Sequence, residues 1–287
     1  MSKKRNKVKL EGTGFLGMFI KYAVCIILAI LCIMPFYIMI VNATRDTYSI
    51  QQSAISLIPS NALMQNYAVF GEKAFDPLVG FKNSMIISTC STALTVYFST
   101  LTAYALVAYN WKLRNALFGF ILGVMMIPGQ VVSIGFYQFM YKLGMTNNLL
   151  ALILPAIAAP GTVFFMRQYM LPSLSMDIVA SARIDGAGEF RTFNTIVLPI
   201  MKPAMATQAI FAFVTSWNRL LEPMILLTRK ENYTMPIMVS LLKGDIYKTE
   251  YGTVYLALTM SVIPLLAIYF MLSKYIIAGV ALGGVKE

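Results

Sequence analysis

The residues best suited to chemistry lie together in an apolar stretch of the last third of the chain. Trp217 and Asn218 are followed by Arg219 and Glu222. Because Arg219 and Glu222 are three residues apart, they can pair on one face of a helix. An ionisable pair among apolar residues is costly unless it faces protein or water, so it indicates a functional site. The alternative is an interfacial anchor, with Trp217 in an aromatic belt and Arg219 reaching lipid headgroups.

A second polar interval, residues 166–203, reads as two short helices joined by a glycine turn. Ser175 is a candidate N-cap, Asp177 lies in the first turn, and Gly186 suits a left-handed helix end. The spacing of Phe190, Phe193 and Val197 predicts one apolar face on a second helix, and Pro199 is expected to close the segment. A compact helix-turn-helix between two apolar runs suits a part that pushes on a partner or is pushed by one; the alternative is an ordinary loop.

Several kinds of chemistry are disfavoured by what the sequence lacks. It has no G-x-x-x-x-G-K-[ST] motif, so we expect no ATP bound by this chain in the P-loop manner. It has no histidine, and Cys25, Cys32 and Cys90 are unpaired in spacing, so we expect no metal site and no enzyme.

The elements that must position these residues are membrane helices. The chain has 287 residues, is 58% hydrophobic and has a mean hydropathy of +0.70. This is too apolar for an ordinary soluble domain and long enough for about six spans of roughly 20 residues. The formal charge of +11 is scattered over loop ends, so nucleic-acid binding is not expected. The fold class predicted is an all-α polytopic membrane protein.

The apolar runs place six transmembrane helices, and the basic residues orient them. The spans are expected at about residues 15–41, 85–109, 116–140, 149–171, 201–228 and 252–278. A basic tail, residues 1–14, precedes an uncleaved first span and places the N-terminus in the cytoplasm by the positive-inside rule. With six spans both termini are cytoplasmic, as is the loop 172–199 between spans four and five, whereas residues 42–83 and 229–251 lie outside.

Two predicted spans contain helix breakers at membrane depth. Pro128 and Gly129 interrupt the third span next to Gln130, and Pro155 and Pro160 interrupt the fourth. Broken helices are tolerated only against protein or a water-filled cavity, so the third span is a candidate pathway wall, against the alternative of a packing kink. Sugar sites combine aromatic rings with amides and carboxylates, and the candidate pathway residues selected by type are Gln130, Tyr137, Thr215, Trp217, Asn218 and Glu222.

The helix-turn-helix resembles a known sequence motif. Ala180, Ser181, Ala182, Gly186, Ile196, Leu198 and Pro199 keep the spacing of the EAA loop of ABC importer permeases. The wording from Ala182 to Ala187 is similar to the carbohydrate branch, the maltose-type permeases, and so is the C-terminal tail, residues 279–286. The chain departs from the pattern where Ala180 stands in place of the usual glutamate and Ser181 in place of the first alanine, so an ion pair of that glutamate with an ATPase cannot form here.

The resemblance implies a permease subunit of a bacterial ABC importer in the cell membrane, taking up a di- or oligosaccharide or a related carbohydrate. The implied partners are a second homologous permease, two ATP-binding cassette subunits that carry ATP and Mg²⁺, and an extracytoplasmic solute-binding protein that meets residues 229–251. The helix from Asp177 to Asp185 would lodge in an ATPase cleft. The residues implied in coupling are Asp177, Ala180, Ser181, Ala182, Arg183, Asp185, Gly186, Leu198 and Pro199.

Three alternatives stay open from the sequence. An ion-coupled secondary transporter would need carboxylates within the spans, and Glu222 is the one candidate. A polytopic membrane enzyme lacks histidine and clustered acids. An importer permease for a solute other than a sugar would share every feature above.

Overall fold

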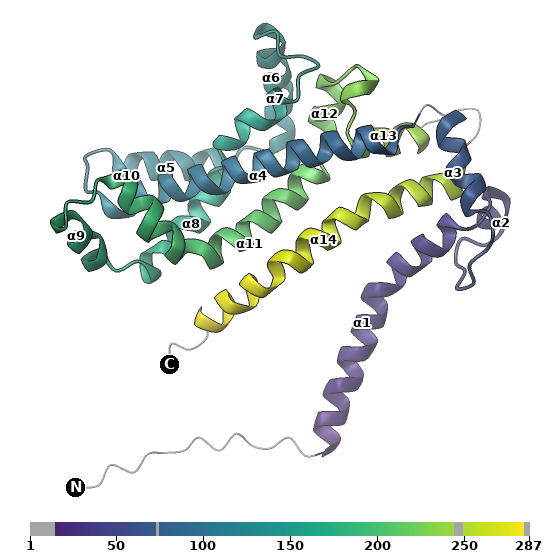
Figure 1. Ribbon diagram of the computed structural model, residues 1–287, viewed down its shortest axis with the longest axis horizontal. Coiled ribbons are helices and arrows are strands. Elements are labelled where there is room, and N and C mark those ends of the chain that lie inside the picture. The colour runs from purple at the N-terminus through teal and green to yellow at the C-terminus, as the bar shows by residue number, and fades with distance from the viewer. Residues whose placement is uncertain (1–14, 73–74, 244–248, 284–287) are drawn as a thin grey trace. The chain divides into compact units, whose positions relative to one another are not determined.

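The computed structural model describes residues 15–72, 75–243 and 249–283, and this part is helical throughout, without strands (Figure 1). The expected basic tail, residues 1–14, and residues 284–286 of the tail motif lie outside the described residues. In the described part five helices are long and apolar enough to cross a membrane, or six if one bent pair forms a single span. The predicted fold class is confirmed.

The chain divides into two compact units, each considered separately. The smaller unit comprises residues 1–67 and 250–259, and the larger unit comprises residues 68–249 and 260–287. The smaller unit contains α1 (Phe15–Ala43), α2 (Thr47–Gln52), the beginning of α3 (Leu63–Glu72) and the beginning of α14 (Tyr251–Gly283).

In the smaller unit, buried polar side chains fold the segment after α1. The guanidinium of Arg45 donates to Asn42 Oδ1 at 2.9 Å, Ser53 O at 2.8 Å and Ser49 O at 2.8 Å. Asn66 Nδ2 donates to the carbonyls of residues 43 and 45. A Cβ on Gly252 would lie 2.3 Å from Arg45 O, so only glycine permits this approach of α14. The segment expected outside the membrane is therefore folded.

In the larger unit, α4 (Pro77–Ala108), α8 (Pro160–Ser173) and α11 (Leu198–Trp217) pack side by side (Figure 1). The buried side of α4 is rich in small hydroxyl side chains, which let helix backbones approach closely. The buried hydroxyl residues of α4 are Ser84, Ser88, Ser91, Thr95, Ser99 and Thr100.

Two apolar clusters hold the two ends of the larger unit. One joins α4, α8, α11 and α9 (Met176–Ile184) through Tyr104, Met170, Met201 and Val179, all at most 2% exposed. The other joins α4 to α7 (Leu150–Ile153) and α12 (Leu221–Leu226), through residues that include Ile87, Leu152 and Leu226. Between membrane helices this stabilisation comes from close van der Waals packing, because lipid tails are as apolar as these side chains.

The third predicted span is two helices. α5 (Arg114–Met125) and α6 (Gly129–Lys142) meet at an angle of 100°. The bend falls at Pro128, whose ring and missing N–H oppose a continuous helix. The fourth predicted span, residues 149–171, is likewise divided into α7, a 3₁₀ turn (η1, Leu154–Ile157) and α8.

The fifth span begins and ends earlier than predicted. Helix runs without interruption from α10 (Glu189–Thr192) through a π-helical turn (η2, Phe193–Val197) into α11, so the expectation that Pro199 closes the segment is wrong. The wide π turn accommodates the residue that cannot donate a backbone hydrogen bond. The helix ends at Trp217 and not near residue 228, with Asn218 as its C-cap, and α12 follows with Pro223 in its first turn, where a proline is tolerated.

The apolar middle of the segment 229–251 packs inside the larger unit. After a 3₁₀ turn (η3, Lys230–Asn232), α13 (Met235–Lys243) buries Met235, Ile237 and Met238. α13 lies against α4, where Ser84 Oγ accepts from Met235 N at 2.9 Å. These buried residues are therefore not available to a partner that meets residues 229–251.

Candidate functional site

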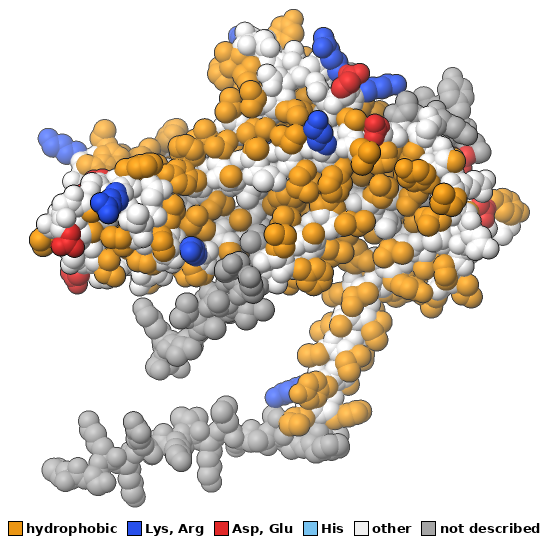
Figure 2. All heavy atoms as spheres, viewed as in Figure 1, with side chains coloured by type: hydrophobic (Ala, Val, Ile, Leu, Met, Phe, Trp, Pro, Cys, Tyr) orange, Lys and Arg blue, Asp and Glu red, His pale blue; other side chains and the backbone are white. Residues whose placement is uncertain are grey.

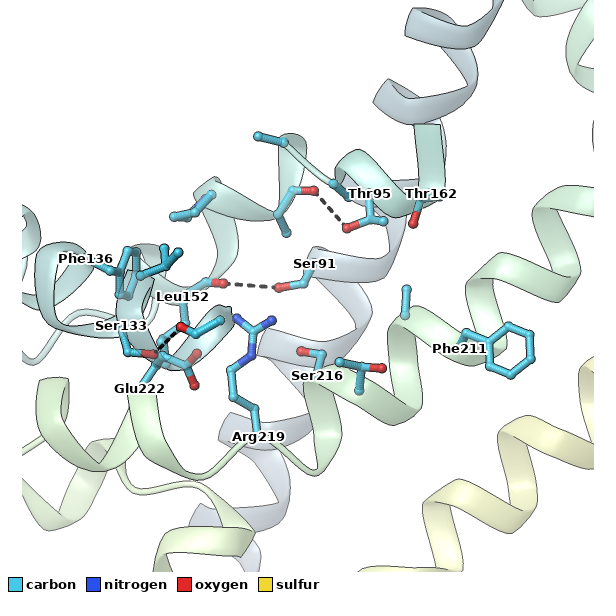
Figure 3. Close-up of a pocket in the computed structure, with 18 of the residues that line it drawn as sticks. Ser91, Thr95, Ser133, Phe136, Leu152, Thr162, Phe211, Ser216, Arg219 and Glu222 are labelled. Carbon is cyan, nitrogen blue, oxygen red and sulfur yellow. Dashed lines mark hydrogen bonds between the residues drawn. The ribbon is translucent and has the colours of Figure 1, made fainter. Parts of the chain in front are cut away.

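A cavity of about 470 Å³ opens between α4, α6, α8, α11 and α12. Figure 3 shows Ser91, Thr95, Ser133, Ser216, Arg219 and Glu222 around it. The helix breaks border the space, since the η1 turn and the start of α6 after the bend both contribute lining residues. Among the described residues the lining is formed by Ser91, Thr95, Gly129, Val132, Ser133, Phe136, Leu152, Pro155, Ala156, Ala158, Ala159, Thr162, Gln208, Phe211, Ala212, Thr215, Ser216, Arg219 and Glu222.

The lining hydroxyls are fixed by hydrogen bonds to backbone. Thr95 Oγ1 donates to Ala156 O at 2.8 Å, Ser91 Oγ donates to Leu152 O at 3.4 Å, and Ser133 Oγ donates to Gly129 O at 3.1 Å (Figure 3). A hydroxyl that donates to backbone still has acceptor lone pairs. The cavity therefore offers three fixed acceptors, two from α4 and one from α6, to a hydroxyl-bearing molecule.

Arg219 and Glu222 both line the cavity, but the ion pair predicted from their spacing is absent. Among the described residues no nitrogen of Arg219 lies within 4.0 Å of a Glu222 carboxylate oxygen. Residues 218–220 lie between α11 and α12, so the three-residue spacing no longer places the two side chains on one helical face. Both groups thus remain available to a molecule in the cavity (Figure 3).

Of the six predicted pathway residues, two line the cavity, namely Thr215 and Glu222, and the other four do not. Gln130 and Tyr137 lie on α6 but each is rotated by about 100° from a lining residue, Gly129 and Phe136 respectively. Asn218 caps the end of α11 through its backbone.

Trp217 has a structural role. Its side chain is 2% exposed, and its Nε1 donates to Ser261 O at 3.1 Å. The indole stacks on Phe213 and meets Phe81 edge-on, each at 5.7 Å between ring centroids. Neither the interfacial-anchor reading nor the pathway reading fits a ring enclosed by protein.

Sequence reasoning missed most of the cavity lining. Ser91, Thr95, Gln208 and Ser216 were not selected as pathway residues, and Arg219 was considered only as a partner of Glu222 or as an interfacial anchor. The signal for α6 was present, because positions 129, 132, 133 and 136 share a helical face and the bend marks that face.

The helix-turn-helix forms as predicted. Ser175 Oγ accepts from Asp177 N at 3.3 Å as the N-cap of α9, and Gly186 has φ +78° in the turn. Phe193 and Val197 are buried as expected, but Phe190 is 70% exposed, because the π turn takes it off their face. α9 is anchored to the bundle through Val179 and exposes Ile184 at 87%.

A groove of about 560 Å³ runs between α9 and the start of the following helix. Four predicted coupling residues line it, namely Asp177, Ser181, Ala182 and Asp185, whereas Ala180 is exposed outside it. Leu198 packs against the apolar cluster and Pro199 lies in the first turn of α11. The other lining residues are Ile178, Ala187, Arg191, Thr195 and Ile196.

Arg183 faces the other way, into a polar cluster at the end of α4. Its Nε donates to Glu189 Oε1 at 2.7 Å, and Glu189 Oε2 accepts from the hydroxyls of Tyr104 and Tyr109. The pKa of Tyr109 is raised, first by burial and then by its hydrogen bond to Glu189, so the phenol keeps its proton. Among the described residues no group of three His, Cys, Asp or Glu side chains could hold a metal ion.

The chain combines apolar helices long enough to span a membrane, a polar cavity among them and a separate capped helix-turn-helix. These features together are those of a subunit of a membrane transport system. Residues 82–281 match the family described as binding-protein-dependent transport system inner membrane component. This range is most of the chain, and the chain belongs to that family. It is a multi-pass membrane transport subunit and not an enzyme.

Individual relatives extend over nearly the whole chain. The arabinooligosaccharides transport system permease protein AraQ of Halalkalibacterium halodurans is 34% identical, over 90% of this chain and 93% of its own length. The trehalose/maltose transport system permease protein MalG of Thermococcus litoralis is 31% identical, over 91% and 94%. A chain of a bacterial ABC transporter involved in import of the acidic polysaccharide alginate superposes with a TM-score of 0.76 at 21% identity, over 91% and 96%, and shares the fold.

Proposed function

We propose that this chain is the permease subunit of an ABC importer for a di- or oligosaccharide or a related carbohydrate. The observation that carries the proposal is the cavity, in which fixed hydroxyl oxygens surround one guanidinium and one carboxylate. Sugars present many hydroxyls that both donate and accept, and such groups satisfy them without requiring a net charge. The names of the relatives support the same substrate class.

The chain supplies the passage and its partners supply the energy. We assign ATP and Mg²⁺ to two partner ATPase subunits, with no cofactor bound by this chain, because it carries no P-loop motif. A second, homologous permease completes the passage, and an extracytoplasmic solute-binding protein delivers the sugar to residues 229–251. In that segment Arg229, Lys230 and Glu231 are exposed and available for this contact.

α9 is the element that ATP binding and hydrolysis on the partner subunits would move. Its exposed Ile184 and the groove containing Asp177 and Asp185 offer an apolar tip beside acidic groups to a cleft of an ATPase. Closure of the ATPases would displace α9 and bias the bundle between inward-open and outward-open states. This requires α9 and both termini to be cytoplasmic.

The test is a reconstituted complex of both permeases, the ATPases and the binding protein in proteoliposomes. A panel of labelled oligosaccharides, glycerol phosphate and amino acids is offered on the binding protein. Uptake of an oligosaccharide that depends on ATP inside the vesicle supports the proposal. Uptake of a non-sugar solute alone, or uptake driven by an ion gradient without ATP, overturns it.

A further inference from the structure

The carboxylate of Glu189 connects three elements that are far apart in the sequence. It is the first residue of α10, and it accepts from Arg183 on α9, from Tyr104 on α4 and from Tyr109 just after α4. The guanidinium of Arg183 also lies over the ring of Tyr109, 5.3 Å from its centroid. We call Tyr104, Tyr109, Arg183 and Glu189 the α4–α9 clasp.

The clasp is more than an exposed ion pair. The side chains of Arg183 and Glu189 are 37% and 44% exposed, and a pair of that kind contributes little alone. The second carboxylate oxygen, however, accepts hydrogen bonds from two phenols. One of them, Tyr104, is 2% exposed, and its ring centroid lies 5.6 Å from that of Phe193. Hydrogen bonds to an ionised carboxylate are stronger than neutral ones. Glu189 therefore joins a surface helix to the buried core.

The clasp gives α9 a direct connection to the cavity. α4 has no proline inside it, and Thr95, which lines the cavity, lies nine residues or about 13 Å along the same helix from Tyr104. The connections along the chain are less stiff. Toward α11 the path passes through the glycine turn and the π turn, and toward α8 it passes through the extended Leu174 and Ser175.

We propose that Glu189 is a positioning residue that transmits the displacement of α9 to the cavity through α4. This inference rests on the proposed function, in which α9 meets the ATPase. Without the clasp α9 keeps its apolar anchor at Val179 but loses its polar connection to α4. ATP hydrolysis then continues while less of it is converted into movement of the cavity wall.

The experiment compares sugar imported per ATP hydrolysed in the reconstituted complex. The variants are Glu189→Gln, Tyr109→Phe and the two combined. Tyr169→Phe is the matched control, because it removes a hydroxyl from a half-buried tyrosine on α8 that makes no hydrogen bond among the described residues. We expect the ratio to fall about fivefold or more in each single variant, with the double variant no worse than the singles.

The outcomes separate this inference from the proposed function. If the wild-type complex does not couple ATP hydrolysis to uptake, both fail. If the wild type couples and the variants keep its ratio, or if the double variant shows the product of two independent losses, the clasp is overturned alone. If Glu189→Gln does not assemble, Tyr109→Phe decides, because it removes one oxygen atom and leaves the ion pair in place.

Discussion

At the scale of single residues, the cavity depends on two charged groups that the protein leaves unpaired with each other. Arg219 and Glu222 line the same space without an ion pair, at the break between α11 and α12. Unpaired charge at membrane depth is expensive, so its presence favours a polar occupant that compensates both groups during transport.

Replacement of Glu222 tests that role. Glu222→Ala removes an ionised acceptor worth about 2 kcal/mol to a bound hydroxyl, so we expect uptake at limiting substrate to fall roughly tenfold or more. Gln130→Ala, a polar residue of α6 outside the cavity, is the control and should leave uptake unchanged. Equal losses in both variants would remove Glu222 from the pathway. Initial rates of labelled sugar uptake give the comparison.

Two glycines separated by a single residue, Gly186 and Gly188, test the turn of the helix-turn-helix. Gly186 has φ +78°, and a side chain there costs about 1–2 kcal/mol, whereas Gly188 has φ −65° and no neighbour within 4 Å of an added Cβ. We expect Gly186→Val to abolish transport while membrane insertion stays normal, because α9 is misaligned. Gly188→Ala should be nearly silent. Insertion is followed by protease protection and transport by uptake; loss of insertion in Gly186→Val would contradict this account.

At the scale of elements, the structure is organised by breaks in its helices. The bend at Pro128, the η1 turn and the break between α11 and α12 all lie at the cavity, so the space is defined by where helices stop. The uninterrupted α4 forms the opposite wall and reaches both apolar clusters. Rigid and broken helices thus have separate roles.

The sequence predicted the elements better than the faces they present. Local signals sufficed for the Ser175 cap and the Gly186 turn, which depend on a few neighbouring residues. The π turn was not predictable, because Pro199 alone reads as a helix end and only packing of Phe193 and Val197 favours a wider turn. Trp217 was assigned to the pathway by residue type, whereas its burial depends on Phe81, more than a hundred residues away.

Two glycines that differ in how closely other atoms pack against them give a further matched pair of variants. A Cβ on Gly252 would lie 2.3 Å from Arg45 O and 2.6 Å from the Asn66 amide, whereas one on Gly71 meets nothing within 4 Å. We expect Gly252→Ala to destabilise the protein by roughly 1–3 kcal/mol, because backbone has to move. Gly71→Ala, inside α3, should be neutral or slightly stabilising. Thermal unfolding in detergent distinguishes them, and equal midpoints would contradict the close approach.

At the scale of the whole molecule, the chain is one component of a transport system. It offers a passage lined by hydroxyls and a surface helix for a partner, and its own sequence carries no P-loop. Because Ala180 stands where the glutamate is usual, we expect any partner of α9 to contact the exposed Ile184 and the groove that holds Asp177, Asp185 and Arg191. We infer that this complex relies on shape and apolar contact at α9 where relatives with the glutamate add an ion pair.

Cysteine cross-linking in the assembled complex tests the central claim, that α9 projects into the cytoplasm and meets the ATPase. Ile184→Cys and Ile58→Cys are introduced after Cys25, Cys32 and Cys90 are replaced by serine; both positions are highly exposed, at 87% and 77%. We expect Ile184→Cys to cross-link to the ATPase and to resist an impermeant thiol reagent added outside. We expect Ile58→Cys to react with that reagent and to form no cross-link to the ATPase. Labelling of Ile184→Cys from outside, or its failure to cross-link to any ATPase subunit, would contradict the account.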